Sequence, residues 1–237
     1  MTTSWWVTST PATDFPALRG DTRTQVAVLG GGIAGLSTAL LLARAGKQVT
    51  LVEADRVAAG VSGYTTAKVT VQHNLVYADL TSRHGADAAR LYAESQVHAL
   101  DWLRHTAGGF DCELEEVPSL VWTESLDDVE TVNEEVEAAR KAGLPMEHAS
   151  TSGLPWDIRA GALLPGQAQF HPRKYLLALT DALVEAGGTV VEQTRALDVS
   201  TEGDGHVVHT EHGDLRCEDV VVTTHYPFLD RGLLFAR

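Results

Sequence analysis

Two hydrophobic runs separated by an amphipathic segment stand out near the start of the chain. Residues 25–29 (QVAVL) and 49–53 (VTLVE) are short and mostly apolar, which is typical of strands buried on both faces. Between the two runs, Leu36, Leu40 and Ala43 recur at the spacing of a single helix face. The pattern therefore predicts a strand–helix–strand unit in which the helix lies on the sheet.

Helical spacing returns twice in the middle of the chain. Residues 77–107 are predicted to be helical, in two pieces that divide near residues 84–87, where a glycine interrupts the pattern. Residues 125–142 are predicted to form an acidic surface helix with valines and an alanine on its inner face. The acidic side chains of this helix are expected to face water: Asp127, Asp128, Glu130, Glu134 and Glu135.

A further helix is predicted to begin at His171-Pro172, because proline suits the first helical position. Two glycines end this helix before a predicted strand at 189–192. Residues 1–24 are predicted to form an irregular arm, and residues 145–165 to be mostly loop with short strands. Other strands are expected at 112–117, 120–123, 196–201, 206–210 and 215–223, the last three as a meander. Helices and strands that alternate in this way predict an α/β fold.

A glycine-rich turn, GGGIAG, joins the first strand to the first helix. Gly30 permits the tight turn, Gly32 has no Cβ and lets the backbone approach a pyrophosphate, and Gly35 lets the helix pack close to the sheet. The helix N-terminus then offers free N–H groups to phosphates. Glu53, at the end of the second strand, can accept hydrogen bonds from ribose hydroxyls and would repel a 2′-phosphate. The unit predicts a site for an adenine dinucleotide and disfavours NADP, and it leaves NAD and FAD both open.

Charge and composition exclude several classes of function. The net charge is −14, which argues against nucleic acid or an anionic membrane as a partner. No signal peptide and no apolar run long enough to span a membrane is visible, so a cytoplasmic protein is expected. Cys112 and Cys217 form no C-x-x-C pair, and His209 and His212 lack the ligands that would complete a metal site, so no metal is predicted.

Longer stretches around the turn resemble a known family. The run GLSTALLLARAGKQVTLVE (residues 35–53) resembles the extended FAD-binding motif of flavoprotein oxidoreductases, and EADRVAAGVSGYTTAK (53–68) resembles the second phosphate loop of the D-amino acid oxidase (DAO-like) superfamily. The segments GQAQFHPR (166–173) and DVVVTT (219–224) are similar to places where that family passes between its domains. Residues 15–21 and TTAKVTVQH (65–73) resemble the branch that carries a C-terminal Rieske [2Fe-2S] domain.

The resemblance implies a fold and a set of cofactor contacts. It implies a Rossmann-like FAD-binding βαβ domain with a three-stranded β-meander, and part of an α+β substrate domain. By resemblance, the pyrophosphate would lie on the turn and helix start, the ribose on Glu53, and phosphate or ribityl groups on three hydroxyl side chains. The implied FAD-binding residues are Gly30, Gly32, Ile33, Ala34, Gly35, Glu53, Ala54, Ser62, Thr65, Thr66, Lys68 and Ala196.

Some of these assignments have plain structural alternatives. The hydroxyls of Ser62, Thr65 and Thr66 could instead satisfy loop backbone, and Ala196 could be an ordinary strand alanine rather than an adenine contact. Lys68 could stabilise negative charge on a reduced flavin or be a solvated lysine. His73 could line an active site or have no role. No catalytic residue is assigned, because the flavin itself would accept hydride at N5 from a small amine, amino acid or hydroxy acid.

The resemblance also implies a domain division. Residues 1–24 are expected to be an arm, residues 25–76 and 172–237 a discontinuous and incomplete FAD-binding domain, and residues 77–171 a partial substrate or cap domain. His225 replaces a glycine of the family's turn, and the cysteines have no Rieske setting. Because the chain resembles only an N-terminal half, the alternative is a truncated or split, non-catalytic FAD-binding fragment that needs a complementary chain or a homo-oligomer. An NAD-dependent dehydrogenase is the other alternative.

Overall fold

A computed structural model of the chain describes residues 4–225. The chain divides into two compact units. The first unit comprises residues 1–66 and 171–237, and the second comprises residues 67–170. The sequence placed residues 67–76 with the FAD-binding domain, but the short strand β4 (Lys68–Val69) pairs with Gln169 and Ala168 and so belongs to the second unit.

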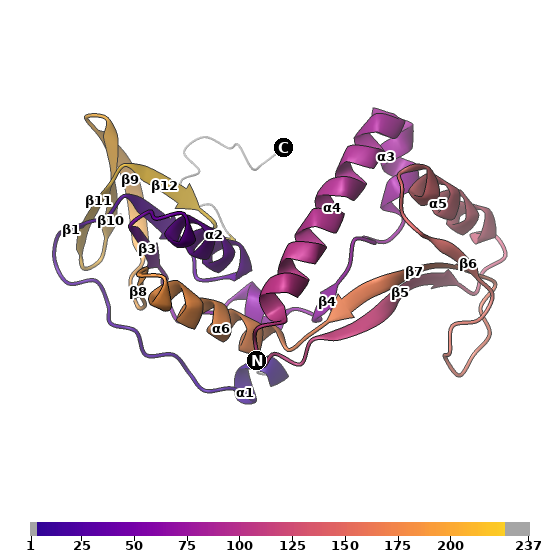
Figure 1. The fold of residues 1–237 in the computed structure, drawn as a ribbon, viewed down its shortest axis with the longest axis horizontal. Helices are drawn as coiled ribbons and strands as arrows, with labels where there is room; N and C mark the ends of the chain where they lie inside the picture. Colours follow the sequence, from indigo (N-terminus) through magenta and orange to yellow (C-terminus); the bar gives the residue numbers. More distant parts are fainter. Residues whose placement is uncertain (1–3, 226–237) are drawn as a thin grey trace. The chain divides into compact units, whose positions relative to one another are not determined.

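A four-stranded parallel sheet with the strand order β12–β2–β3–β8 forms the centre of the first unit (Figure 1). Its strands are β2 (Val26–Leu29), β3 (Val49–Val52), β8 (Thr189–Val191) and β12 (Asp219–Val222). Helix α2 (Ile33–Arg44) connects β2 to β3 and packs against helix α6 (Pro172–Glu185), which precedes β8. The predicted strand–helix–strand unit is therefore confirmed.

Close packing between α2 and the turn before it depends on Gly35. A Cβ on Gly35 would lie only 1.9 Å from the carbonyl oxygen of Gly30, so no larger residue fits without a backbone shift. On the other side of the contact, every residue of β2 and β3 is buried, as are Leu36 and Leu40 of the helix. Gly35 therefore allows α2 to pack closely against the turn and to cover the sheet.

A second sheet in the first unit carries the meander. Strands β9 (Ala196–Glu202), β10 (Gly205–Thr210) and β11 (Gly213–Cys217) are antiparallel, and β1 (Thr22–Arg23) adds in parallel to β11. Val208 and Leu215 of this sheet share a core with Leu29 of the parallel sheet. The single strand predicted at 215–223 is wrong, because the chain leaves one sheet at Glu218 and joins the other as β12.

The N-terminal arm is more ordered than its sequence indicated. It contains a short helix, α1 (Trp5–Thr8), and it ends in β1. The indole Nε1–H of Trp6 donates to the carbonyl oxygen of Thr65, 2.8 Å away, just after the 3-10 helix η1 (Val61–Tyr64). Local propensity does not predict that the arm is ordered, because the arm is stabilised by contacts with residues far away in the sequence.

The second unit contains a sheet with the strand order β4–β7–β5, and β6 (Glu147–Ala149) pairs with β7. Strand β5 (Glu115–Thr123) is one strand with a bulge after Val117, where two strands were expected. Strand β7 (Ala160–Gln169) occupies a stretch that was expected to be mostly loop up to residue 165. Pro165 and Gly166 are uncommon in strands, so the sequence did not predict one here. Both residues lie opposite the bulge in β5, where proline and glycine are tolerated.

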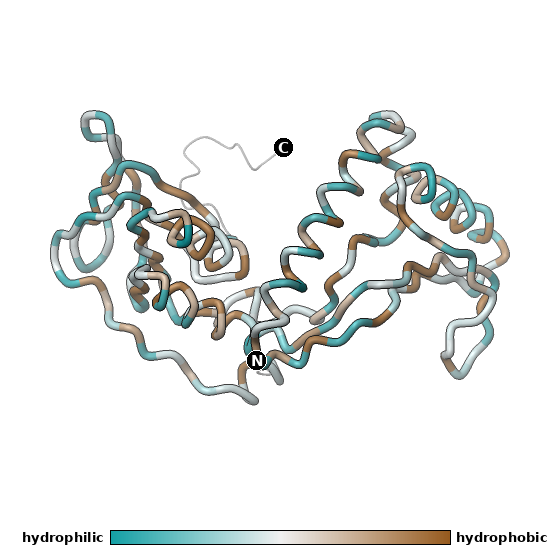
Figure 2. The backbone as a smooth tube through the Cα atoms, viewed as in Figure 1, coloured by the Kyte–Doolittle hydropathy of each residue, from teal (hydrophilic) through white to brown (hydrophobic). Residues whose placement is uncertain are grey.

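Three helices pack in the second unit: α3 (Val76–His84), α4 (Ala86–Ala107) and α5 (Val129–Lys141). The break between α3 and α4 lies at Gly85, as the pattern predicted. Polar and apolar residues alternate along the long helix α4 (Figure 2). Within residues 4–225, no helix is long and apolar enough to cross a membrane.

Glu135 does not face water as predicted. Its side chain is buried, and its carboxylate accepts hydrogen bonds from the backbone N–H groups of Tyr77 (3.0 Å) and Ala78 (2.7 Å). These N–H groups lie in the first turn of α3 and would otherwise lack partners. Burial nevertheless raises the pKa of Glu135 above its ordinary value.

Candidate functional site

A cavity of about 320 Å³ opens at the carboxyl ends of β2 and β3 in the first unit. In open parallel sheets this edge is where ligands bind. The glycine turn, the loop after β3, the start of β9 and the residues after β12 contribute its walls. The lining residues include Leu29, Gly30, Gly31, Gly32, Val52, Glu53, Ala54, Ala58, Gly60, Val61, Ser62, Thr194, Arg195, Ala196, Thr223, Thr224 and His225.

Backbone rather than side chains forms the wall of this cavity at the turn. Gly30 has a φ of +111°, and a Cβ there would lie 3.0 Å from Thr223 Oγ1. A Cβ on Gly32 would lie 3.0 Å from Ser62 Oγ. Gly32 precedes α2 without a side-chain cap, and the Ile33 N–H donates to Ser62 Oγ over 3.1 Å. Ser62, which lies on a separate loop, therefore accepts a hydrogen bond from a backbone N–H group at the start of the helix.

Glu53 lies directly after β3 and against the glycine turn. Its Oε2 accepts a hydrogen bond from the Gly31 N–H (2.7 Å), and its Oε1 accepts one from the Asp55 N–H (2.8 Å). Each carboxylate oxygen can accept more than one hydrogen bond, so these two contacts leave acceptor capacity that faces the cavity. The residue predicted to bind ribose is thus fixed in position by the backbone on both sides.

The predicted cofactor residues separate into two groups in the structure. Gly30, Gly32, Glu53, Ala54, Ser62 and Ala196 line the cavity together. The others do not line it. Ile33 and Ala34 directly follow Gly32 at the exposed start of α2, Gly35 is buried beneath the turn, Thr65 and Thr66 are exposed beyond η1, and Lys68 lies in the second unit.

Two threonines after β12 line the cavity, and the prediction did not assign them to the site. Thr223 Oγ1 donates to the Leu29 carbonyl oxygen over 2.7 Å and so lies next to Gly30. Thr224 Oγ1 is buried and has no hydrogen-bond partner within the described chain. The signal for both residues was the strand before them, because β12 runs parallel to β2 and ends at the same edge. His225, which follows them, is exposed.

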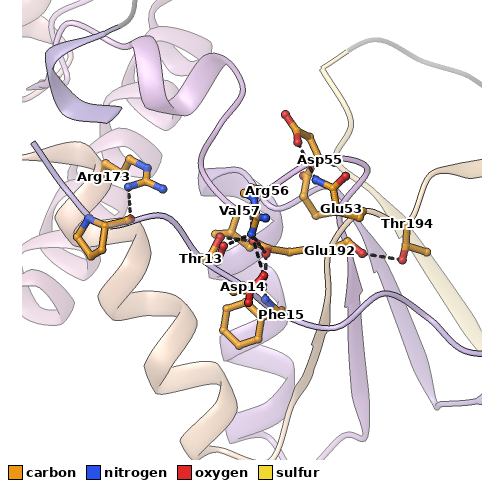
Figure 3. Close-up of polar contacts among 12 residues, drawn as sticks. Thr13, Asp14, Phe15, Glu53, Asp55, Arg56, Val57, Arg173, Glu192 and Thr194 are labelled. Atoms are coloured by element: carbon orange, nitrogen blue, oxygen red, sulfur yellow. Dashed lines mark hydrogen bonds and ion pairs between the residues drawn. The ribbon is translucent and has the colours of Figure 1, made fainter. Parts of the chain in front are cut away.

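A buried carboxylate anchors the loop that forms one wall of the cavity (Figure 3). Glu192, directly after β8, is fully buried and accepts hydrogen bonds from the Val57 N–H (2.7 Å) and the Phe15 N–H (3.0 Å). The Thr13 hydroxyl donates to it as well, and Arg56 Nη1 forms an ion pair with it at 3.5 Å. Glu192 therefore connects the N-terminal arm to the loop after β3.

Histidines with no role in this cavity have partners of their own. His209 hydrogen-bonds Ser200 (2.8 Å) and Asp214 (2.9 Å), and His212 Nε2 lies 2.9 Å from the Gln193 carbonyl oxygen. In the second unit, His73 Nδ1 lies 2.8 Å from the Tyr92 hydroxyl. Among residues 4–225, no group of three or more His, Cys, Asp or Glu side chains is arranged to hold a metal ion.

Comparisons with known proteins show what the chain is similar to. The sequence model of the DAO family, described as FAD-dependent oxidoreductases, matches residues 25–233. YhfW of Bacillus subtilis, which is named as a Rieske 2Fe-2S iron–sulfur protein, is 35% identical over 235 residues, covering 98% of this chain and 46% of YhfW. Gamma-glutamylputrescine oxidoreductase of Escherichia coli is 26% identical over 89% of this chain and 51% of that enzyme.

The fold is also similar to solved structures. The crystal structure of glycine oxidase from Geobacillus kaustophilus superimposes with a TM-score of 0.67 at 22% identity, covering 85% of this chain and 55% of that one. The chain thus spans about half the length of the curated relatives it matches.

Proposed function

The chain belongs to the DAO family of FAD-dependent oxidoreductases, and from this premise we propose that its first unit binds FAD and serves the oxidation of a small amine or amino acid. The observation that carries the proposal is the cavity at the carboxyl ends of β2 and β3, where glycine backbone forms the wall beside the carboxylate of Glu53. A wall without side chains suits a pyrophosphate, which needs close contact with N–H groups.

Two further features of the cavity fit this cofactor. The unpartnered Oγ1 of Thr224 offers a donor and acceptor to a polar ligand, in a position where an unpaired hydroxyl would otherwise cost stability. A Cβ on Gly32 would lie only 3.0 Å from Ser62 Oγ, so this hydroxyl packs directly against the turn beside the start of α2. NAD shares the adenine dinucleotide part, and the family match is what favours FAD.

In this proposal each part of the cavity has a separate role. Gly32 and the start of α2, including Ile33 and Ala34, would hold the pyrophosphate, and Glu53 would accept from ribose hydroxyls. Ala196, at the start of β9, would lie along the adenine, and Ser62 would orient a phosphate oxygen. When bound, FAD supplies the acceptor for a hydride from a substrate C–H bond.

Amines and amino acids are favoured as substrates over hydroxy acids. The relatives include gamma-glutamylputrescine oxidoreductase and glycine oxidase, whose names denote an amine and an amino acid. The electron acceptor, and a complementary chain or a second copy as partner, stay predictions. Size-exclusion chromatography of the purified chain would check the second of these.

Flavin retention tests the proposal directly. The purified chain should bind added FAD and show flavin absorbance after gel filtration, and Gly32→Glu should abolish this binding because its side chain fills the pyrophosphate position and carries a like charge. Gly109→Glu adds the same side chain at an exposed site in the second unit and should retain FAD. Wild-type protein that folds but binds NAD instead of FAD, or neither, would contradict the proposal.

A further inference from the structure

Three side chains of the meander form a hydrogen-bonded chain on the outer face of its sheet. Ser200 lies on β9, His209 on β10 and Asp214 on β11. In the strand register, His209 lies directly opposite Asp214 and diagonally from Ser200. Val208 and Leu215, the chain neighbours of His209 and Asp214, pack into the core of the first unit. Because side chains alternate between the two faces of a strand, the three polar side chains project away from that core.

Asp214 sets the tautomer of His209. His209 Nδ1 lies 2.9 Å from Asp214 Oδ1, and a carboxylate can only accept a hydrogen bond. Nδ1 therefore carries the proton, which leaves Nε2 of the neutral ring as an acceptor. Ser200 Oγ lies 2.8 Å from that Nε2, so the serine hydroxyl donates to the imidazole. Carboxylate, imidazole and hydroxyl thus lie in the order in which a base takes the proton of a serine nucleophile.

The N-terminal arm holds Asp214 in place. The Asp214 N–H donates to Asp21 Oδ1 over 3.0 Å. Gly213, the residue before it, has a φ of +138°, and a Cβ there would lie 2.5 Å from the carbonyl carbon of Gly20. The backbone of the arm therefore packs against the turn that carries Asp214. An orienting group that is itself held in position is one of the geometric requirements of a nucleophilic site.

The three side chains can be reached from solvent. The side chains of His209 and Asp214 are 39% and 33% exposed, and Ser200 is half-buried. None of the three is among the residues that line the cavity of the proposed flavin site. An acyl donor can therefore approach the Ser200 hydroxyl without entering that cavity.

A backbone N–H group follows the serine on the edge of the sheet. Strand β9 is an outer strand, in the order β1–β11–β10–β9. The Val199 N–H donates to Asp198 Oδ1 over 2.8 Å and so does not point at β10. Because N–H groups alternate in direction along an antiparallel strand, the Thr201 N–H faces the same edge. This N–H can donate to negative charge that develops on an acyl group bonded to Ser200 Oγ.

Charge around the three residues narrows the kind of acyl donor. Asp198 and Asp214 lie on the two sides of His209 in the ladder. Arg216, the next residue of β11 on this face, forms ion pairs with two further carboxylates. An anionic acyl donor would therefore be repelled, and a small neutral ester suits the open face.

We propose that Ser200, His209 and Asp214 form a second catalytic site, which hydrolyses small neutral esters. Ser200 is the nucleophile and His209 the general base, and Asp214 is a positioning residue because it contacts His209 and not the reacting atoms. All three residues belong to the first unit. The activity goes beyond the proposed function, since it requires no flavin.

Each step transfers an acyl group without a change in oxidation state. Ser200 Oγ bonds to the ester carbonyl carbon, and its proton passes to His209 Nε2. The bond from that carbon to the alcohol oxygen then breaks, and His209 gives the proton to this oxygen. Water attacks the acyl-serine and gives one proton to His209, and the carboxylic acid leaves as that proton returns to Ser200 Oγ.

Two probes of the full chain test the proposal. A fluorophosphonate forms a bond from its phosphorus to a nucleophilic serine oxygen with loss of fluoride, and peptide mass spectrometry locates the label. p-Nitrophenyl acetate releases p-nitrophenolate on acylation, which is followed by absorbance. The wild-type chain should be labelled at Ser200 and should release p-nitrophenolate faster than Ser200→Ala.

Matched variants separate the roles. His209→Gln should lower both rates at least about tenfold, because general-base catalysis contributes about 10²–10⁴-fold. Asp214→Asn should lower them as well, because an amide can donate to Nδ1 and so favour the tautomer that cannot accept from the serine. Ser95→Ala removes an exposed serine whose hydroxyl donates to the Tyr92 carbonyl oxygen (2.8 Å), and it should behave like wild type.

The results decide this inference independently of the flavin proposal. Wild-type chain that takes no label at Ser200, or that takes it as fast as His209→Gln does, would overturn the inference and leave a structural hydrogen-bond network. Labelling of Ser200 that depends on His209 would support the inference even in protein that binds no FAD. Urea midpoints show whether each variant is folded. If Asp214→Asn is not, the comparison of wild type with His209→Gln still gives the answer.

Discussion

Exchanging Gln72 for methionine should leave the free energy of unfolding unchanged or raise it, whereas the same exchange at Gln167 should lower it. Both glutamines are buried in the second unit, where they line a second cavity of about 320 Å³. Methionine has nearly the same length as glutamine, so the change in side-chain volume is small and common to both variants. The two exchanges therefore differ mainly in the hydrogen bonds that they remove.

The structure gives the magnitudes. At Gln72, the lost bond to the Ala162 carbonyl costs about 0.5–1.5 kcal/mol, and removal of the unpaired Oε1 returns about 1–3 kcal/mol. At Gln167, the buried Val71 N–H is left unpaired at a cost of about 1–3 kcal/mol, and the bond to Pro165 adds about 1 kcal/mol. The two variants should therefore differ by at least about 1.5 kcal/mol, and by about 4 kcal/mol at the centre of these ranges.

Urea denaturation of the ligand-free chain provides the assay. The midpoint for Gln72→Met should match or exceed that of wild type and that for Gln167→Met should fall, with the slope m unchanged in all three proteins. Equal destabilisation by the two exchanges would refute the reasoning, because it would mean that Gln72 Oε1 is satisfied in the folded protein.

Three further predictions concern buried groups. Burial raises the pKa of Glu135 above its ordinary value of 4.5, so the native state binds the proton more tightly and this group's contribution to stability falls as pH rises from below 4.5 through the folded pKa. The free energy of unfolding of Glu135→Gln relative to wild type should therefore increase with pH, and a pH-independent difference in urea titrations would contradict this. Glu192→Gln places an amide nitrogen among backbone donors and should destabilise the chain by about 3 kcal/mol, with faster proteolytic cleavage of the N-terminal arm; unchanged cleavage would count against the anchoring role. Gly35→Ala should prevent folding or lower the melting temperature sharply because its Cβ meets the Gly30 carbonyl, while Gly109→Ala, which meets nothing closer than 3.7 Å, should melt like wild type.

The parts of the fold that local pattern determines were predictable from the sequence. Strands β2 and β3 and helix α2 carry their own periodicity, and the glycines between them have mechanical reasons that hold in any protein with this turn. The cavity walls made by Gly30, Gly32 and Glu53 follow from that unit.

Features that depend on distant partners were not predictable. Strand β7 contains Pro165 and Gly166, and it is a strand because β4, β5 and β6 pair with it. Glu135 looks like any acidic residue of a surface helix until the start of α3 is placed over it. Gln72 Oε1 has no hydrogen-bond partner within the described chain, and no sequence pattern indicates that a buried atom lacks a partner.

The two units differ in how much of the chain each one needs before it can fold. The second unit is a single continuous stretch, residues 67–170, whereas the sheet of the first unit joins β2 and β3 to β8 and β12, which are made more than a hundred residues later. During synthesis on the ribosome, β2 and β3 therefore lack their neighbouring strands β12 and β8 until the whole second unit has emerged. We expect the inserted unit to become compact first, and the glycine turn to acquire its threonine neighbours only after residues 223 and 224 have emerged.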